Sequence, residues 1–517
     1  MTLLAAALAG FAVLVVEILG VHLLAPWFGA STVVWSQQIG LVLGAIALGG
    51  WLGGRRAAVS PDPRRDASWC LLVGGLLVVL CAFGLAPFAM WMLPEGLTLD
   101  QAAAVFGRGS ILAALIFYVP PVLFLSMVSP LLVQIRAAEQ AAGRAAGEVS
   151  CAGTVGSLLG VLFAVFIAVP VLGVRTTLAL MAVVLFAASF LLRSRGSTVG
   201  AAALPLLLLL TPDLAARANL PEGAEVLAVA ESSYQHLRVV GFEDGTRWLQ
   251  MNEGLDSYQS LWRPDGGWSG GYYDLFALAP LYAEPSSDGG PVAAWILGYG
   301  AGTAVQPLAA ATSALGVDLE VTGLELDPVV EELAAEWMPL PAREGVSVRA
   351  IGGADARALL RTAAGGLDLI LLDAYARQFE IPLHLATEEF FAEVHAQLRD
   401  GGVFALNLGT ATLPDPDSGL LGAIRAAVGA SFGAHLRLQR VPYSRNWMLF
   451  ARRGKPLPPL DSLGERLPAG WPLALGAACL PGQVVEGLPD GEAVRLLDQR
   501  NPLGLQQLLD WSRGGGG

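Results

Sequence analysis

The sequence predicts a multi-spanning α-helical membrane domain, followed by a small antiparallel β unit and a larger α/β domain. Three observations predict this order. Long apolar runs with few charges fill the first 192 residues, strand-like segments with turn signals follow from about Pro221, and strands alternate with helical segments from about Val292 to Arg452. The predicted boundaries are 1–196 for the membrane domain, 197–222 for a linker, 223–288 for the β unit, 289–455 for the α/β domain and 456–517 for a C-terminal extension.

Six apolar runs in the first part of the chain approach the length of about 20 residues that crosses a bilayer. The composition is 54% hydrophobic and only 15% charged. A set of buried helices in a large water-soluble protein is a poor alternative, because so many consecutive apolar runs are hard to keep in water. A cleaved signal peptide also fits poorly, since no basic residue precedes the first run. The candidate spans are Leu3–Ala25, Val33–Leu52, Trp69–Leu93, Ser110–Val133, Cys151–Leu172 and Thr176–Leu192.

Arginines gather in three segments that connect or follow the candidate spans. With six spans, all three clusters fall on one side of the membrane, and that side is expected to be cytoplasmic. We therefore expect a multi-pass protein of the inner (plasma) membrane whose soluble domain is cytoplasmic. The segment Thr198–Thr211 is short for a span and contains Pro205, so we interpret it as interfacial; if it crossed, the soluble domain would lie outside. The clusters are Arg55, Arg56, Arg64 and Arg65; Arg136 and Arg144; Arg193 and Arg195.

Two polar residues of the first candidate span stand out, because ionisable groups inside a membrane are costly and often functional. They are Glu17 and His22, which lie about one helical turn apart. An interhelical hydrogen bond that holds the bundle together is the alternative explanation, and both remain open. Gly153, Gly156 and Gly160 have the spacing of small residues at a close helix–helix contact.

The β unit is predicted from three short segments rich in strand-forming residues, Val226–Ala230, Leu237–Phe242 and Arg247–Met251. The turn residues Glu243–Gly245 separate the second segment from the third, as in an antiparallel pair. After Arg453 the chain becomes rich in proline and glycine, which indicates an extended tail over the α/β domain.

The α/β domain has the residue pattern of a Rossmann-like (class I methyltransferase-like) nucleoside site. A strand at Ala293–Leu297 leads into Gly298-Tyr-Gly-Ala-Gly302, and acids follow the later strands. Glycines allow the backbone to approach a ligand closely, and a carboxylate after the next strand can accept both ribose hydroxyls. The expected cofactor-binding residues are Gly298, Gly300, Gly302, Glu325, Asp355 and Ala356. Helix caps or loop acids are the alternative for Glu325 and Asp355.

Several motifs carry a resemblance to a known family. The soluble half resembles the spermidine synthase (polyamine aminopropyltransferase) family, and the whole chain resembles its membrane-fused bacterial branch. The membrane motifs are Leu24-Ala-Pro-Trp-Phe-Gly29 and Ala152-Gly-Thr-Val-Gly-Ser157. The soluble motifs are Glu231-Ser-Ser-Tyr-Gln235, Tyr272-Tyr-Asp-Leu-Phe-Ala-Leu-Ala-Pro280, the run from Ile381 to Phe390, and Leu497-Asp-Gln-Arg-Asn-Pro502.

The resemblance implies a role for each matching residue. Asp373 would be the catalytic aspartate and Tyr272 the catalytic tyrosine, while Gln235 would lie on the strand that meets the thioadenosine. Glu325 would bind the ribose and Asp355 the adenine side. The resemblance implies decarboxylated S-adenosylmethionine as co-substrate, with S-adenosylmethionine as the other candidate.

The chemistry at these positions follows from the residue types. A diamine such as putrescine is protonated at neutral pH and is then no nucleophile. Asp373 at a strand end, beside Tyr272, can hold the ammonium group, take up its proton and direct the free lone pair. The electrophile would be the propyl carbon next to a sulfonium, with neutral methylthioadenosine leaving. Asp373 also suits a helix cap, and we expect a catalytic role for it.

Two departures from the family pattern concern cation recognition. Ala301 stands where the family has an aspartate facing the donor's amino end, and Ala376 where it has a second aspartate for the distal amine. Candidates to compensate are Glu253, Asp256 and Asp274, and we include Asp274 and Tyr375 as expected substrate-binding residues. Packing is the alternative role for Tyr375 and His384.

Three functions from different classes therefore stay open: an aminopropyltransferase, a methyltransferase acting on an amine or membrane-associated acceptor, and a non-catalytic sensor or transporter of polyamines or nucleosides. We expect a small-molecule amine and the lipid bilayer as partners, no nucleic acid, and a homodimer or higher homo-oligomer as a possible assembly. The four cysteines lack the spacing of a metal site, so we expect no metal.

Overall fold

The computed structural model divides the chain into two compact units. One comprises residues 1–220 with short segments at 229–237 and 251–256, and the other comprises 221–228, 238–250 and 257–517. Thr198–Thr211, Glu253, Asp256 and Ala376 lie outside the described residues. The structure describes residues 1–28, 32–92, 108–192, 220–252, 258–285, 289–375, 381–410, 415–442, 444–460, 463, 467–491 and 493–503.

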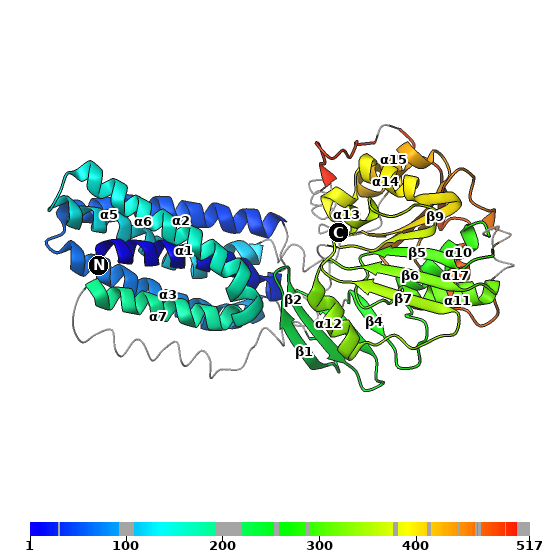
Figure 1. Cartoon of the computed structure of the whole chain (residues 1–517), viewed down its shortest axis with the longest axis horizontal. Coiled ribbons are helices and arrows are strands. Elements are labelled where there is room, and N and C mark those ends of the chain that lie inside the picture. Colours follow the sequence, from blue (N-terminus) through cyan, green and yellow to red (C-terminus); the bar gives the residue numbers. More distant parts are fainter. Residues whose placement is uncertain are drawn as a thin grey trace. The chain divides into compact units, whose positions relative to one another are not determined.

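The first unit is a bundle of long apolar helices (Figure 1). Within the described residues, six helical segments are long and apolar enough to cross a membrane, and each overlaps one of the six predicted spans. Two short π-helices interrupt the regular helical pattern, one before α5 and one after α6. The elements are α1 (Thr2–Phe28), α2 (Thr32–Val59), α3 (Pro63–Met92), η1 (Ala114–Tyr118), α5 (Val119–Ala137), α6 (Ala142–Phe163), η2 (Ala164–Leu172) and α7 (Val174–Leu192).

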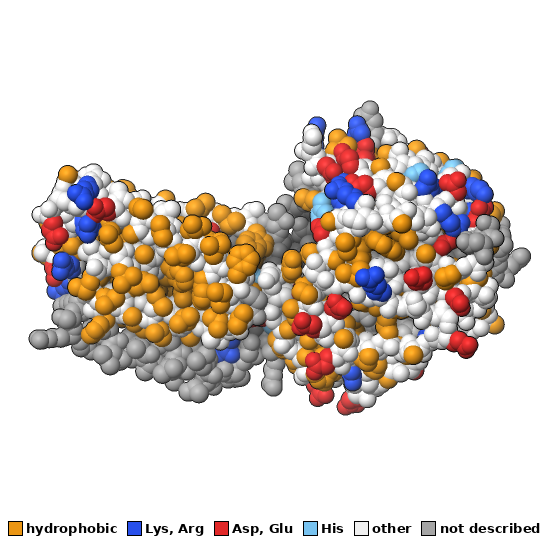
Figure 2. All heavy atoms as spheres, in the orientation of Figure 1, with side chains coloured by type: hydrophobic (Ala, Val, Ile, Leu, Met, Phe, Trp, Pro, Cys, Tyr) orange, Lys and Arg blue, Asp and Glu red, His pale blue; other side chains and the backbone are white. Residues whose placement is uncertain are grey.

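The surface of this bundle has the character of a lipid-facing surface. Hydrophobic side chains cover its length, and charged side chains gather at one end (Figure 2). The exposed side chains include Trp51, Leu80, Leu158 and Phe166. An apolar exterior of this extent is unfavourable in water and favourable in hydrocarbon.

Small residues bring α1 and α6 into backbone contact. A Cβ atom built on Gly156 would lie 2.8 Å from the Cα of Ala7, and one on Gly160 would lie 2.5 Å from the carbonyl oxygen of Phe11. Both distances are too short for a real side chain, so only glycine fits. This agrees with the predicted close contact of small residues, a packing mode that membrane helices use where water supplies no driving force.

We expect Gly156→Leu to destabilise the bundle by about 2 kcal/mol, because the added side chain meets the backbone of Ala7, which cannot rotate away. Thermal unfolding of the full chain in detergent measures the effect. Gly147→Leu on the same helix is the matched control, since a Cβ at Gly147 meets nothing within 4 Å. An equal unfolding temperature for both variants would contradict the close contact.

A four-stranded sheet precedes the α/β fold, with strands in the order β1-β2-β3-β4. They are β1 (Glu225–Glu231), β2 (His236–Gly241), β3 (Arg247–Met251) and β4 (Ser260–Trp262). The first three coincide closely with the predicted segments. The fourth was not predicted, because three residues that precede a proline-glycine sequence carry little pattern. β4 pairs antiparallel with β3 and lies beside the glycine turn, where Leu261 N–H donates to Thr303 Oγ1 over 2.9 Å.

An eight-stranded mixed sheet forms the centre of the second unit, in the order β12-β10-β11-β9-β8-β5-β6-β7. The five strands from β9 to β7 are parallel, and β11, β10 and β12 continue the sheet antiparallel. Together with the helical bundle, this confirms the predicted fold class. The strands are β5 (Val292–Leu297), β6 (Leu319–Leu324), β7 (Val346–Ile351), β8 (Leu367–Leu372), β9 (Leu398–Gly409), β10 (Leu436–Arg440), β11 (Asn446–Arg452) and β12 (Val484–Glu486).

Helices cover both faces of this sheet, so its central strands are buried on each side. In β8, Leu369 and Leu371 belong to one hydrophobic cluster while Ile370 and Leu372 belong to the other. The first cluster contains η4, α10 and α11, and the second contains α14 and α15. The helical elements are η4 (Tyr272–Ala277), α10 (Leu278–Tyr282), α11 (Val305–Leu315), α12 (Pro328–Trp337), α13 (Ala356–Leu360), η5 (Leu383–Leu385), α14 (Glu388–Gln397), α15 (Gly419–Phe432) and α17 (Leu473–Ala478).

Candidate functional site

The glycine turn after β5 lies directly against the end of β8. Gly298, Gly300 and Gly302 have φ angles of 84°, 55° and 79°, which side-chain-bearing residues rarely adopt. A Cβ atom on Gly298 would lie 2.6 Å from the Cα of Ala374, so no side chain fits between the two strand ends. The start of the turn therefore packs against the backbone of Asp373 and Ala374.

Glu325, at the end of β6, holds this turn in place. Its carboxylate accepts a hydrogen bond from Gly300 N–H at 2.9 Å and another from Asp327 N–H at 3.1 Å. Burial raises the pKa of Glu325, and the two backbone donors act in the opposite direction. The residue as a whole is partly exposed, and its carboxylate is anchored by these two bonds.

Asp373, directly after β8, is held by two donors from distant parts of the chain. Tyr272 Oη donates to Oδ2 at 3.1 Å, and Asn407 Nδ2 donates to Oδ1 at 2.8 Å. Burial of the surroundings raises the pKa of the Asp373 carboxyl to about 6, while the two donors lower it. The side chain remains partly exposed. A carboxylate with this pKa is ionised at neutral pH and still takes up a proton readily.

Asn407 belongs to a chain of hydrogen bonds behind Asp373. Its Oδ1 accepts from Asn446 Nδ2 at 2.8 Å, and Asn446 Oδ1 lies 2.8 Å from Ser444 Oγ. These bonds fix the amide of Asn407 so that its nitrogen faces the carboxylate. Sequence reasoning missed Asn407; the available signal was a single amide within the apolar run of β9, where a buried polar residue needs partners.

Tyr272 reaches Asp373 from the 3-10 helix η4. Its ring stacks on that of Tyr273 with centroids 4.1 Å apart, and Tyr273 Oη donates to the carbonyl of Gln259 at 2.5 Å. Burial, followed by the nearby Asp373 carboxylate, holds the pKa of the Tyr272 phenol well above its usual value. Tyr272 is therefore neutral and acts as a hydrogen-bond donor.

Asp355 caps α13, since its Oδ1 accepts from Ala358 N–H at 2.9 Å. Its other oxygen lies 3.5 Å from His384 Nε2, and the side chain is 45% exposed. The helix cap therefore involves only Oδ1 of the Asp355 carboxylate. Ala356 is the first residue of the same helix.

A buried ion-pair group fixes the start of α13. Arg357 pairs with Glu393 at 2.8 Å and with Asp498 at 2.7 Å, and it also donates to the carbonyl of His384. Thr387 Oγ1 donates to the same Asp498. The C-terminal motif is thus attached to α13 and to the segment after Asp373, and this organises the predicted adenine side.

For three other predicted residues, the structure describes no hydrogen bond to Asp373. Asp274 anchors its own loop, because its carboxylate accepts from Ser269 N–H, Ser269 Oγ and Gly270 N–H. Tyr375 Oη donates to the carbonyl of Asn407 at 2.6 Å and accepts from Gly409 N–H at 3.0 Å, so it ties down the end of β9. Gln235 lies between β1 and β2 in the other compact unit. Their predicted ligand contacts stay predictions.

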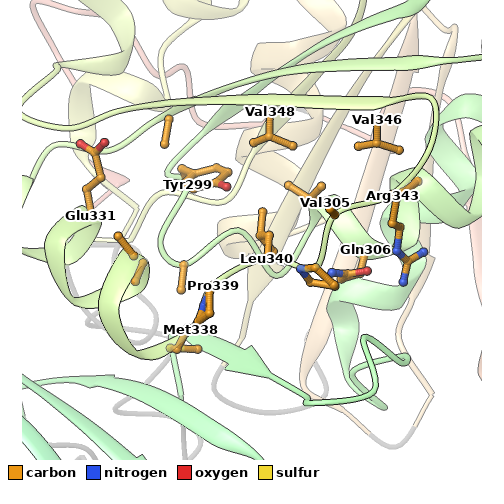
Figure 3. A pocket seen from close by; sticks show the side chains of 17 residues that line it. Tyr299, Val305, Gln306, Glu331, Met338, Pro339, Leu340, Arg343, Val346 and Val348 are labelled. Atoms are coloured by element: carbon orange, nitrogen blue, oxygen red, sulfur yellow. The ribbon is translucent and has the colours of Figure 1, made fainter.

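Ala301 has a structural role in place of a charge. Its N–H donates to Ser260 Oγ at 2.9 Å, and the side chain lines a cavity of about 380 Å³ between the glycine turn, α11, α12 and β7. Figure 3 shows mainly apolar side chains around it, with Glu331 at one end and Arg343 at the other. Tyr272, Glu325 and Asp373 are not among its lining residues.

The chain shows similarity to two curated proteins. It is 30% identical over 224 residues to a probable polyamine aminopropyl transferase of Bifidobacterium longum, covering 43% of this chain and 46% of that protein. The chain is similar to the polyamine aminopropyltransferases. This confirms the resemblance drawn from the motifs. It is also 30% identical over 128 residues to an N-terminal histidine N-methyltransferase of Emericella nidulans, covering 24% of this chain and 21% of that protein.

These matches span less than half the length of the curated relatives, and no family model matches the chain. Two solved spermidine synthase structures align with part of the chain. A probable spermidine synthase from Corynebacterium glutamicum aligns with a TM-score of 0.37 at 18% identity, covering 54% of this chain and 99% of that one. Spermidine synthase from Thermotoga maritima aligns with a TM-score of 0.36 at 17% identity, covering 49% and 84%.

We expect Glu325→Ala to weaken nucleoside binding by about 30-fold, corresponding to about 2 kcal/mol, because it removes both an acceptor for the ligand and the anchor of Gly300 N–H. Calorimetry with methylthioadenosine on the full chain measures this. Glu332→Ala, on the exposed side of α12, is the matched control. Equal affinities of the two variants would remove Glu325 from the site.

Proposed function

We propose that this protein is a membrane-spanning aminopropyltransferase. It transfers an aminopropyl group from decarboxylated S-adenosylmethionine to a diamine such as putrescine, and it releases a polyamine and methylthioadenosine. One observation carries the proposal: Asp373, whose carboxylate is held by Tyr272 and Asn407 with a pKa of about 6, lies with its backbone against the glycine turn. The similarity to a polyamine aminopropyl transferase supports it.

The reaction needs a base for the amine. Asp373 accepts a proton from the ammonium group, which frees the nitrogen lone pair. The nitrogen attacks the propyl carbon bonded to the sulfonium; the N–C bond forms, the C–S bond breaks, and its electron pair stays on sulfur as a neutral thioether. The proton remains on Asp373 and passes to solvent after product release. Sulfur leaves without protonation, so this scheme uses no general acid.

The remaining groups position the reactants. Glu325 and the glycine turn hold the nucleoside, while Tyr272 and Asn407 orient the carboxylate by one hydrogen bond to each oxygen. No covalent enzyme intermediate is formed, so alignment of the nitrogen with the C–S bond accounts for much of the rate.

Ala301 favours a second candidate, a methyltransferase that uses S-adenosylmethionine and acts on an amine or a membrane-associated acceptor. An alanine at this position places no carboxylate beside the donor's amino end. S-adenosylmethionine carries a carboxylate there itself, so it meets no like-charge repulsion from the alanine. The match to an N-methyltransferase supports this alternative.

The bundle supports insertion in the inner membrane with the catalytic domain in the cytoplasm. Basic residues lie at the end of α2 and the start of α3, and again at the end of α5 and the start of α6. If successive helices cross the membrane in opposite directions, these helix ends lie on the same side. Basic residues are enriched on the cytoplasmic side of membranes, so we assign this side to the cytoplasm.

We expect the transfer rate to depend on pH through Asp373. Below pH 6 the carboxyl group is protonated and cannot accept a proton, so kcat/KM rises as pH increases through about 6. Tyr272→Phe removes a donor that favours the ionised form, so the rise moves to higher pH. A pH–rate profile of both proteins tests this. A profile that Tyr272→Phe leaves unshifted would exclude Asp373 as the titrating base.

The deciding experiment is a mass-spectrometric product assay on the detergent-purified chain. It offers diamines and polyamines with decarboxylated S-adenosylmethionine in one reaction and S-adenosylmethionine in another. We expect an aminopropylated amine and methylthioadenosine. Asp373→Asn should lower the rate by at least about 1000-fold while nucleoside binding stays within about threefold, because the amide keeps the shape but accepts no proton.

Two outcomes would contradict the proposal. Methylated product with S-adenosylhomocysteine would establish the methyltransferase instead. Loss of nucleoside binding in Asp373→Asn would make the residue a cofactor ligand. Asp400→Asn is the matched control, since Asp400 is exposed and pairs with Arg453 on the surface.

A further inference from the structure

A second group of polar side chains lies in the core of the helical bundle, where α1, α2 and η1 meet. The meeting point is Gly20 of α1. A Cβ atom built there would lie 3.0 Å from Tyr118 Cε1 and would collide with Gln38 Nε2. Glycine therefore leaves room for the Gln38 amide and the Tyr118 ring side by side.

These side chains lack the hydrogen bonds that a membrane interior demands. Gln38 Nε2, Gln38 Oε1 and Tyr118 Oη have no hydrogen-bond partner within the described part of the chain. Each residue is only 1% exposed, so solvent does not supply one. Unsatisfied polar groups are costly in hydrocarbon, and polar residues kept there usually serve a function. The amide and the phenol are therefore available for a ligand.

The backbone is irregular at the same point. η1 is a π-helix that ends at Tyr118, and Pro120 and Pro121 follow in the first turn of α5. π-Helical turns are frequent at functional sites, and interrupted membrane helices commonly line solute sites. Two independent features, unpartnered side chains and a modified helix, thus coincide in one place.

The charge around this point favours a cation. Glu17 lies one turn before Gly20 on α1 and has no hydrogen-bond or ionic partner among the described residues. Neither residues 3–54 nor residues 109–135 contain a lysine or arginine. The neighbourhood offers one carboxyl group, a phenol oxygen, an amide oxygen and the face of an aromatic ring.

We propose that the helical bundle contains a binding site for a protonated primary amine, formed by Gln38, Tyr118 and Glu17 around Gly20. An ammonium group has three donors, which match Gln38 Oε1, Tyr118 Oη and the Glu17 carboxylate, and the Tyr118 ring adds a cation–π contact. The site is closed in this structure, and entry of the amine separates the Gln38 amide from the Tyr118 ring. It is independent of the proposed transfer reaction.

The test measures binding of radiolabelled putrescine to the full chain in lipid nanodiscs, without any adenosyl donor. We expect Gln38→Leu to bind one putrescine fewer per chain than wild type, and Tyr118→Phe to bind at that site at least tenfold more weakly. Ser36→Ala, on the exposed side of α2, is the matched control and should bind as wild type does.

Both variants remove an unpartnered polar group, so they should unfold at or above the wild-type temperature. Tyr118→Phe loses only one oxygen atom, so this variant still tests the site if Gln38→Leu does not fold. Unchanged stoichiometry and affinity in the folded variants would overturn the site. Putrescine displaced by sodium ions at equal concentration would overturn the assignment to amines. Asp373→Asn should keep the Tyr118-sensitive binding, so failure of the transfer reaction and failure of this site give different results.

Discussion

The desolvation of the Asp373 carboxylate is the constraint on which the catalytic unit depends. Burial raises the pKa of this carboxyl group to about 6, because the charged form loses hydration. Hydrogen-bond donors lower the pKa again, so that the group is still ionised at neutral pH. The sheet order supplies both. β8 lies between β5 and β9, so the residue after β8 meets the glycine turn on one side and Asn407 of β9 on the other. η4 then adds Tyr272. The proposed base, the groups that orient it and the proposed nucleoside-binding turn therefore come from neighbouring strands and one short helix.

The same physical rule acts in the bundle with a different result. In the catalytic unit, each oxygen of Asp373 has a donor, and the amide behind it has further partners. At Gly20 the polar atoms of Gln38 and Tyr118 have none within the described residues. A polar side chain with all its hydrogen bonds made is fixed in one geometry, whereas a buried polar side chain without partners can still form hydrogen bonds to a bound ligand. A bundle that served only as an anchor would gain stability by replacing both side chains with apolar ones.

Much of the catalytic unit could be predicted from the sequence, because parallel strands place their carboxyl ends at one edge of the sheet. Glu325 and Asp373 follow strands directly, and glycine spacing identified the turn. Asn407 could not be predicted, since it lies inside β9 and its partner depends on which strand is adjacent. The anchoring of Asp274 and Tyr375 was equally hidden, because their partners are backbone atoms of loops and strand ends. The position of the Gln38 amide could not be predicted either, because it depends on which helices meet at Gly20.

At position 301 the chain has an alanine where the resembling family has an aspartate that recognises a positive charge. Ser260 Oγ accepts a hydrogen bond from the backbone N–H of Ala301, and the methyl group lines a mainly apolar cavity. The Glu325 carboxylate anchors the neighbouring Gly300. The amino end of a decarboxylated donor would thus have one ionic contact fewer at the glycine turn than the family pattern implies. Proton transfer depends on the pKa and position of Asp373, while amine affinity depends on the number of acceptors, so the two properties separate.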